Sequence, residues 1–141
     1  MKRSATAVWS GGLKDGKGQI STQSGVLDNT PYSFVTRFGD QAGSNPEELI
    51  AAAHAGCFTM ALSAQLGEAG MTAENLSTQA TVTVEKLADG FAITEVNLAL
   101  TARIPGADRQ AFEAAAKRAK EGCPVSKLLK ANITLETKLN S

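Results

Sequence analysis

The sequence lacks an excess of charge of either sign, because 14 lysines and arginines balance 14 aspartates and glutamates. No run of like charges stands out either, so we expect neither nucleic acid nor a membrane surface as a partner. Histidine occurs once and cysteine twice. These residues supply at most three zinc ligands and have no paired spacing, which disfavours a zinc site. Small molecules and a second copy of the chain remain as the expected partners.

No targeting segment is expected either. Met1, Lys2 and Arg3 are followed by a stretch, residues 4–10, that is too short and too polar for the apolar region of a signal peptide. We therefore expect a cytoplasmic protein, in which a pair of cysteines is more often catalytic or redox-sensing than structural. Linkers, repeats and low-complexity tracts are missing as well, so residues 1–141 are expected to form a single domain.

One stretch carries no formal charge between Glu48 and Glu68. It is long enough to raise the question of a membrane span, but it is built on alanine rather than leucine and includes His54. Ser44 or Asn45 can cap a helix, and Pro46 suits its first position. We predict a buried helix from Pro46 to Gly67 or Gly70. Its apolar residues occupy every face, and two chains would cover such a helix more easily than one.

The remaining segments predict strands and two further helices. Alternation of apolar and polar residues indicates strands at 5–10 and 18–22, and again at 76–85 and 91–104, with a β-bulge near Thr94 and Glu95. Residues 32–38 are rich in β-branched and aromatic side chains and are expected to form a third strand. Asp108 should cap an amphipathic helix ending at Gly122, followed by a helical turn after Pro124 and a strand at 133–139. The fold class expected is α+β, with antiparallel sheets around a long helix.

The two cysteines have different surroundings. Cys57 lies within the uncharged helix, where the alternative to a reactive thiol is a small buried hydrophobic residue. Cys123 follows Gly122 and precedes Pro124, at the start of a predicted helix whose unpaired amides would favour a thiolate. Together they suggest a thiol pair that cycles through a disulfide. Their spacing of 66 positions is unlike the C-x-x-C motif of general thiol–disulfide oxidoreductases.

Three other residues are candidates for chemistry. His54 stands one turn before Cys57, but a Cys-His hydrolase would need a third orienting group, and packing within the helix is the alternative. Glu47 lies ten residues before Cys57, about 15 Å away along a helix, so it could serve that thiol only from a second chain. Otherwise it only stabilises the helix N-terminus. Arg37 could hold a thiolate or polarise a peroxide, or it could be an ordinary surface residue.

The segments Asn45–Leu49, His54–Phe58 and Gly122–Ser126 resemble the OsmC/Ohr family of thiol peroxidases. The resemblance extends over essentially the whole chain, and residues 24–27, 31–32, 36–38 and 90–94 are similar to its OsmC branch. Gly56 departs from the alanine that many members carry before the first cysteine. The resemblance implies an intertwined homodimer with the OsmC-like fold and two sites at the subunit interface.

The resemblance also implies a role for each site residue. Cys57 would be the peroxidatic cysteine and Cys123 the resolving one, with Arg37 and Glu47 orienting and activating the thiolate. The expected reaction reduces organic hydroperoxides, and hydrogen peroxide more weakly, through a Cys57 sulfenic acid and a Cys57–Cys123 disulfide that an external dithiol reduces. It needs no metal or other cofactor. The alternative function is a non-catalytic stress protein that binds a small apolar ligand between subunits.

Overall fold

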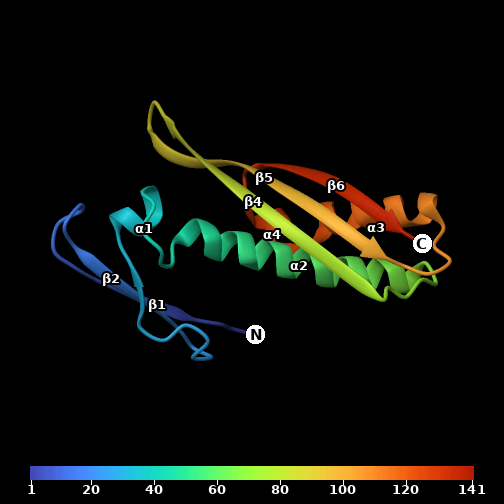
Figure 1. Cartoon of the computed structure of the whole chain (residues 1–141), viewed down its shortest axis with the longest axis horizontal. Coiled ribbons are helices and arrows are strands. Elements are labelled where there is room, and N and C mark those ends of the chain that lie inside the picture. Colours follow the sequence, from blue (N-terminus) through green and yellow to red (C-terminus); the bar gives the residue numbers. More distant parts are fainter. The chain divides into compact units, whose positions relative to one another are not determined.

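The computed structural model describes all of residues 1–141, which divide into two compact units, Met1–Leu49 and Ile50–Ser141. The first unit contains β1 (Ala5–Ser10), β2 (Lys17–Thr22), β3 (Thr30–Tyr32) and the short helix α1 (Phe34–Phe38) (Figure 1). These strands form an antiparallel sheet in the order β1-β2-β3. The two strands predicted at 5–10 and 18–22 are therefore confirmed, and they pair as an antiparallel hairpin.

The third strand predicted over residues 32–38 is wrong. The strand ends at Tyr32, and Ser33 caps helix α1 instead. The Thr36 amide donates to Ser33 Oγ at 3.3 Å, and the Ser33 amide donates to Thr36 Oγ1 at 2.8 Å. This reciprocal capping box satisfies two amides, and the Phe34 and Phe38 rings pack 5.1 Å apart at helical spacing. Local capping therefore outweighs the β propensity of the segment.

The first unit has no hydrophobic core of its own. Every buried hydrophobic side chain of the protein belongs to the second unit. In the first unit, Val8, Leu13 and Val26 are 59%, 69% and 84% exposed. A segment of this size is too small to be stable with its apolar side chains in water. The exposed apolar side chains of the first unit therefore need a surface outside this unit to cover them.

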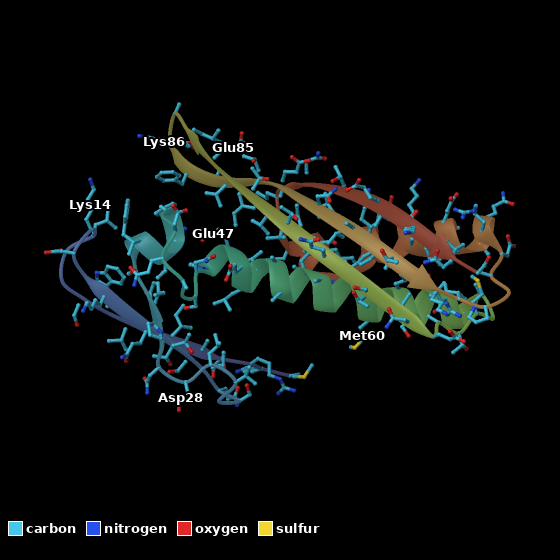
Figure 2. All side chains as sticks on the ribbon, viewed as in Figure 1. Lys14, Asp28, Glu47, Met60, Glu85 and Lys86 are labelled. Carbon is cyan, nitrogen blue, oxygen red and sulfur yellow. The ribbon has the colours of Figure 1, made fainter.

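Helix α2 (Pro46–Glu68) starts and ends close to the predicted positions. Asn45 Oδ1 accepts the Glu48 amide at 2.8 Å, so Asn45 is the cap among the two candidates, Ser44 and Asn45. Only one stripe of the helix is buried, formed by His54, Phe58, Leu62 and Leu66. Met60 is 74% exposed, and Figure 2 shows its side chain projecting away from the sheet of the second unit.

By length and composition alone, α2 is the one helix that could cross a membrane. Core helices of soluble proteins meet the same criterion, and its buried stripe belongs to the hydrophobic core of the second unit.

The second unit is built on a sheet with the order β4-β5-β6, formed by β4 (Asn75–Leu87), β5 (Gly90–Arg103) and β6 (Asn132–Asn140). Strands β4 and β5 are antiparallel. Thr83 pairs with Glu95 and Val84 with Ile93, which leaves Thr94 as the extra residue of a bulge, as predicted. Strand β6 pairs in parallel with β5, so the expectation of purely antiparallel sheets is wrong at this edge.

The parallel pairing follows from the connection between β5 and β6. This connection holds α3 (Arg109–Gly122) and α4 (Pro124–Leu128), which are long enough to return the chain to the far end of the sheet. Asp108 caps α3 as predicted, its Oδ1 accepting the Gln110 amide at 3.1 Å. The core lies between one face of the sheet and the helices α2 and α3 (Figure 1), and includes Phe58, Leu62, Val96, Leu98, Leu100, Phe112, Ala116 and Cys123.

Candidate active site

The structure brings Cys57 and Cys123 into contact. Both are free thiols, and the Cys123 side chain is close enough to act directly on the charge of the Cys57 thiol within the second unit. Cys57 is half-buried on α2, whereas Cys123 is 1% exposed at the junction of α3 and α4. Two sulfur atoms separated by 66 positions in the sequence are therefore neighbours in the core. Proximity of the two side chains is one requirement for a disulfide between them.

Some of the groups around Cys57 raise the pKa of its thiol and others lower it. Burial raises the pKa of the Cys57 thiol, a hydrogen bond from the Val125 backbone lowers it, and the hydrogen bond and charge of Cys123 raise it again. The net direction is upward. No arginine or lysine of the second unit forms a hydrogen bond or ion pair with this thiol.

Cys123 occupies the cap position of α4, as its place before Pro124 suggested. The Ser126 amide points at its sulfur at 3.4 Å, and the Ser126 hydroxyl lies 3.1 Å from the same atom. Ser126 Oγ in turn lies 2.7 Å from His54 Nε2. The result is a continuous buried chain of hydrogen bonds from α2 to Cys123.

His54 is packed within the core, which is the alternative that the sequence left open. Its side chain is 0% exposed, and burial lowers the pKa of the imidazole. The ring is therefore neutral at physiological pH. Nδ1 has no hydrogen-bond partner. His54 contacts Ser126 and not the thiol of Cys57.

Arg37 and Glu47 form an ion pair within the first unit. Arg37 lies in α1, not at the end of a strand, because the capping box at Ser33 turns this segment into a helix. Its Nε and Nη2 both lie 2.8 Å from Glu47 Oε1. Glu47 sits in the first turn of α2 (Figure 2), and its Oε2 is buried without a partner.

A small apolar hollow adjoins Arg37. It has a volume of about 180 Å³ and is lined by Trp9, Leu13, Tyr32, Ser33, Phe34, Arg37 and Phe38. The Arg37 guanidinium carbon lies 4.9 Å from the centre of the Phe38 ring. A larger hollow of about 690 Å³ in the same unit includes neither Arg37 nor Glu47 among its lining residues. The smaller hollow therefore combines a cation with aromatic walls.

The sequence singled out Cys57, Cys123, Arg37 and Glu47, and the structure groups them into two pairs. It brings the thiols together in one unit and the ion pair together in the other. Ser126 was missed as a contact of the site. It lay inside the Gly122–Ser126 motif, but its partner His54 is 72 positions away, so no local spacing could join them. No group of three or more histidine, cysteine or acidic side chains is arranged to hold a metal ion.

Two free thiols in contact within an α+β core define a class of proteins capable of reversible disulfide chemistry. A family model described as OsmC-like protein matches residues 39–138. The chain is 53% identical to a protein named peroxiredoxin OsmC from Escherichia coli K12 over 135 residues, covering 96% of this chain and 94% of that protein. The chain belongs to the OsmC family.

Solved structures agree with this assignment. The organic hydroperoxide resistance protein OhrB of Bacillus subtilis superimposes with a TM-score of 0.70 at 27% identity, covering 96% of this chain and 98% of OhrB. An OsmC-like protein of Mycoplasma pneumoniae has a TM-score of 0.78 at 16% identity, covering 100% and 99% of the two chains, and shares the fold. The predicted α+β fold and family are confirmed.

Proposed function

We propose that this protein is a cysteine-based peroxidase that reduces organic hydroperoxides. The observation that carries the proposal is the contact between Cys57 and Cys123 inside the core. Support for the reaction class comes from the 53% identity to a protein named a peroxiredoxin. Support for an organic substrate comes from the apolar hollow beside Arg37 and from the name of the Bacillus relative, an organic hydroperoxide resistance protein.

The proposed reaction begins with the Cys57 thiolate, which attacks the terminal oxygen of the hydroperoxide. The O–O bond breaks, the alcohol leaves after taking up a proton, and Cys57 becomes a sulfenic acid. The Cys123 sulfur then attacks the Cys57 sulfur, the S–O bond breaks, and water leaves. An external dithiol reduces the disulfide by thiol exchange. Every redox step uses sulfur and peroxide alone, so the proposal includes no metal or organic cofactor.

The ion pair of Arg37 and Glu47 would supply the cation that Cys57 lacks. Because Glu47 precedes Cys57 by ten residues on one helix, about 15 Å of helix separates them, so the pair must come from a second chain. Two further features favour a homodimer: α2 is buried along one stripe only, and the first unit has no core of its own. The unpartnered Glu47 Oε2 is available to a donor from that second chain.

Mass spectrometry tests the chemistry. After one equivalent of cumene hydroperoxide, the intact protein should lose two hydrogens and gain no oxygen. The Cys123→Ser variant should reduce one equivalent of peroxide and gain oxygen, whereas Cys57→Ser should consume none. If Cys57→Ser keeps the wild-type rate, the assignment is wrong. If peroxide leaves both thiols of the wild type unchanged, the protein is not a peroxidase and the ligand-binding alternative is favoured.

Mixing two inactive variants tests the shared site. An Arg37→Ala chain retains Cys57, and a Cys57→Ser chain retains Arg37, so a mixed dimer has one intact site if each site uses both chains. Random exchange of equal amounts should restore about one quarter of the wild-type activity. Each variant dimer alone is the matched control. No gain on mixing, with exchange verified by native mass spectrometry, would contradict the proposed arrangement.

The proposed compartment is the cytoplasm, where both cysteines would be kept as free thiols between turnovers.

A further inference from the structure

A buried chain of polar atoms ends at Cys123. His54 Nε2 lies 2.7 Å from Ser126 Oγ, and Ser126 Oγ lies 3.1 Å from Cys123 Sγ. The three side chains come from α2, α4 and the residue that caps α4, and they are 0%, 8% and 1% exposed. A buried polar chain of this kind is costly to assemble unless its donors and acceptors match. The direction in which the hydrogen bonds are donated therefore decides whether they stabilise negative charge on the Cys123 sulfur.

The unpartnered Nδ1 atom of His54 sets that direction. A neutral imidazole carries one proton, and placing it on Nδ1 would leave a buried N–H with no acceptor. Orphaned buried N–H groups are rarer than under-satisfied acceptors, so the proton belongs on Nε2. Nε2–H then donates to Ser126 Oγ, which leaves the Ser126 hydroxyl hydrogen to donate to Cys123 Sγ. The Ser126 amide adds a second donor to the same sulfur at 3.4 Å.

We infer that Ser126, held in place by His54 as a positioning residue, stabilises negative charge on the Cys123 sulfur and makes Cys123 the leaving group when the Cys57–Cys123 disulfide is reduced. The inference deepens the proposed function and rests on it. A thiolate of the external dithiol attacks Cys57, its sulfur bonds to Cys57, and the Cys57–Cys123 bond breaks. Cys123 leaves with the electron pair as a thiolate. The second thiol of the reductant then displaces Cys57, which completes the reduction.

The exposure of the two sulfurs points to the same order of events. Cys57 is half-buried, whereas Cys123 is 1% exposed, so an external thiol can reach Cys57 and not Cys123. The buried sulfur must therefore leave, and thiol exchange is faster when the leaving sulfur is the more stable anion. No charged side chain pairs with Cys123, Ser126 or His54 in the chain. The hydrogen-bond chain is thus the available source of stabilisation.

The reduction rate tests the inference without depending on peroxide. Diamide can form the disulfide directly, and dithiothreitol can then reduce it under pseudo-first-order conditions, followed by acid quenching and mass spectrometry. Ser126→Ala should slow this reduction about 10- to 100-fold, the value of a hydrogen bond to a charged group. Ser126→Thr retains the hydroxyl and should recover most of the rate. An unchanged rate in Ser126→Ala would overturn the inference.

Two further variants separate positioning from packing. His54→Leu removes the donor behind Ser126 and should slow reduction, whereas His54→Gln can still donate and should be closer to the wild type. Thr59→Val is the matched control, because Thr59 on α2 loses a hydroxyl that bonds to Thr78 and not to Cys123. It should reduce at the wild-type rate. Equal rates for His54→Leu and His54→Gln would contradict the role given to His54.

The rate of alkylation of Cys123 distinguishes lost stabilisation of the thiolate from loosened packing, because the first lowers this rate and the second raises it. In a Cys57→Ser background, Ser126→Ala should lower the rate at which iodoacetamide modifies Cys123 at fixed pH, because the thiolate is the reactive form. Greater exposure of a loosened core would raise that rate, and such a rise would overturn the inference.

The two proposals fail in distinguishable ways. If peroxide never produces the disulfide, the proposed function is wrong, while reduction of the diamide-formed disulfide still measures the role of Ser126.

Discussion

His54 makes the stability of the folded chain depend on pH below neutrality. It is the only histidine in the sequence, its side chain is 0% exposed, and burial lowers its pKa. In the unfolded chain the same ring has a pKa of about 6.5. Below that pH the unfolded chain binds a proton that the folded chain does not. The free energy of unfolding therefore falls as the pH is lowered through the unfolded pKa towards the folded one.

The size of the loss follows from the fully buried ring. If the imidazole stays neutral in the folded state, lowering the pH from about 7.5 to about 5.5 costs about 1.4 kcal/mol of stability. Urea denaturation of the reduced protein, at one protein concentration and at both pH values, measures it. His54→Gln has no group that titrates at this position and should lose much less. If both proteins lose the same amount, another group is responsible and the reasoning about His54 is refuted.

Two more predictions concern neighbours on α2. Gly56 is exposed within the helix and a Cβ there would meet nothing within 4 Å, so Gly56→Ala should raise the free energy of unfolding by about 0.5–1 kcal/mol. A decrease in urea denaturation would show that the added methyl group meets a surface absent from the single chain. Burial is the main cause of the raised pKa of Cys57, so above about pH 8.5 the unfolded chain releases a proton that the folded chain keeps, and stability should fall as the pH rises. Cys57→Ser should reduce that fall, and an equal fall in both proteins would contradict the assigned cause.

Segments governed by local signals could be predicted from the sequence. Asp108 caps its helix as expected, Asn45 is the cap among the two candidates for α2, and the change of alternation phase near Thr94 correctly located the bulge. The strand expected over residues 32–38 is wrong because the reciprocal caps of Ser33 and Thr36 favour a helix more than Phe34, Val35 and Phe38 favour a strand. Side-chain caps of this kind compete directly with strand pairing for the backbone amides.

Features that join distant segments were harder to predict. The parallel pairing of β6 depends on where the two-helix connection places the start of that strand. The alternation of residues within β6 carries no information about this placement. The contact of His54 with Ser126 likewise requires α2 and α4 to be packed in one core. The pairing of the two cysteines was anticipated from their motifs, and the structure supplies the contact. The roles of Cys57, Cys123, Arg37 and Glu47 in catalysis stay predictions.

The parallel crossover also affects when the thiols can meet during synthesis. Cys123 lies in the connection between β5 and β6, and this connection is closed only when β6 has paired along β5. Since β6 is translated after both cysteines, a growing chain on the ribosome carries them before their final placement exists. Oxidation of the nascent polypeptide at that stage would precede closure of the crossover in the finished fold.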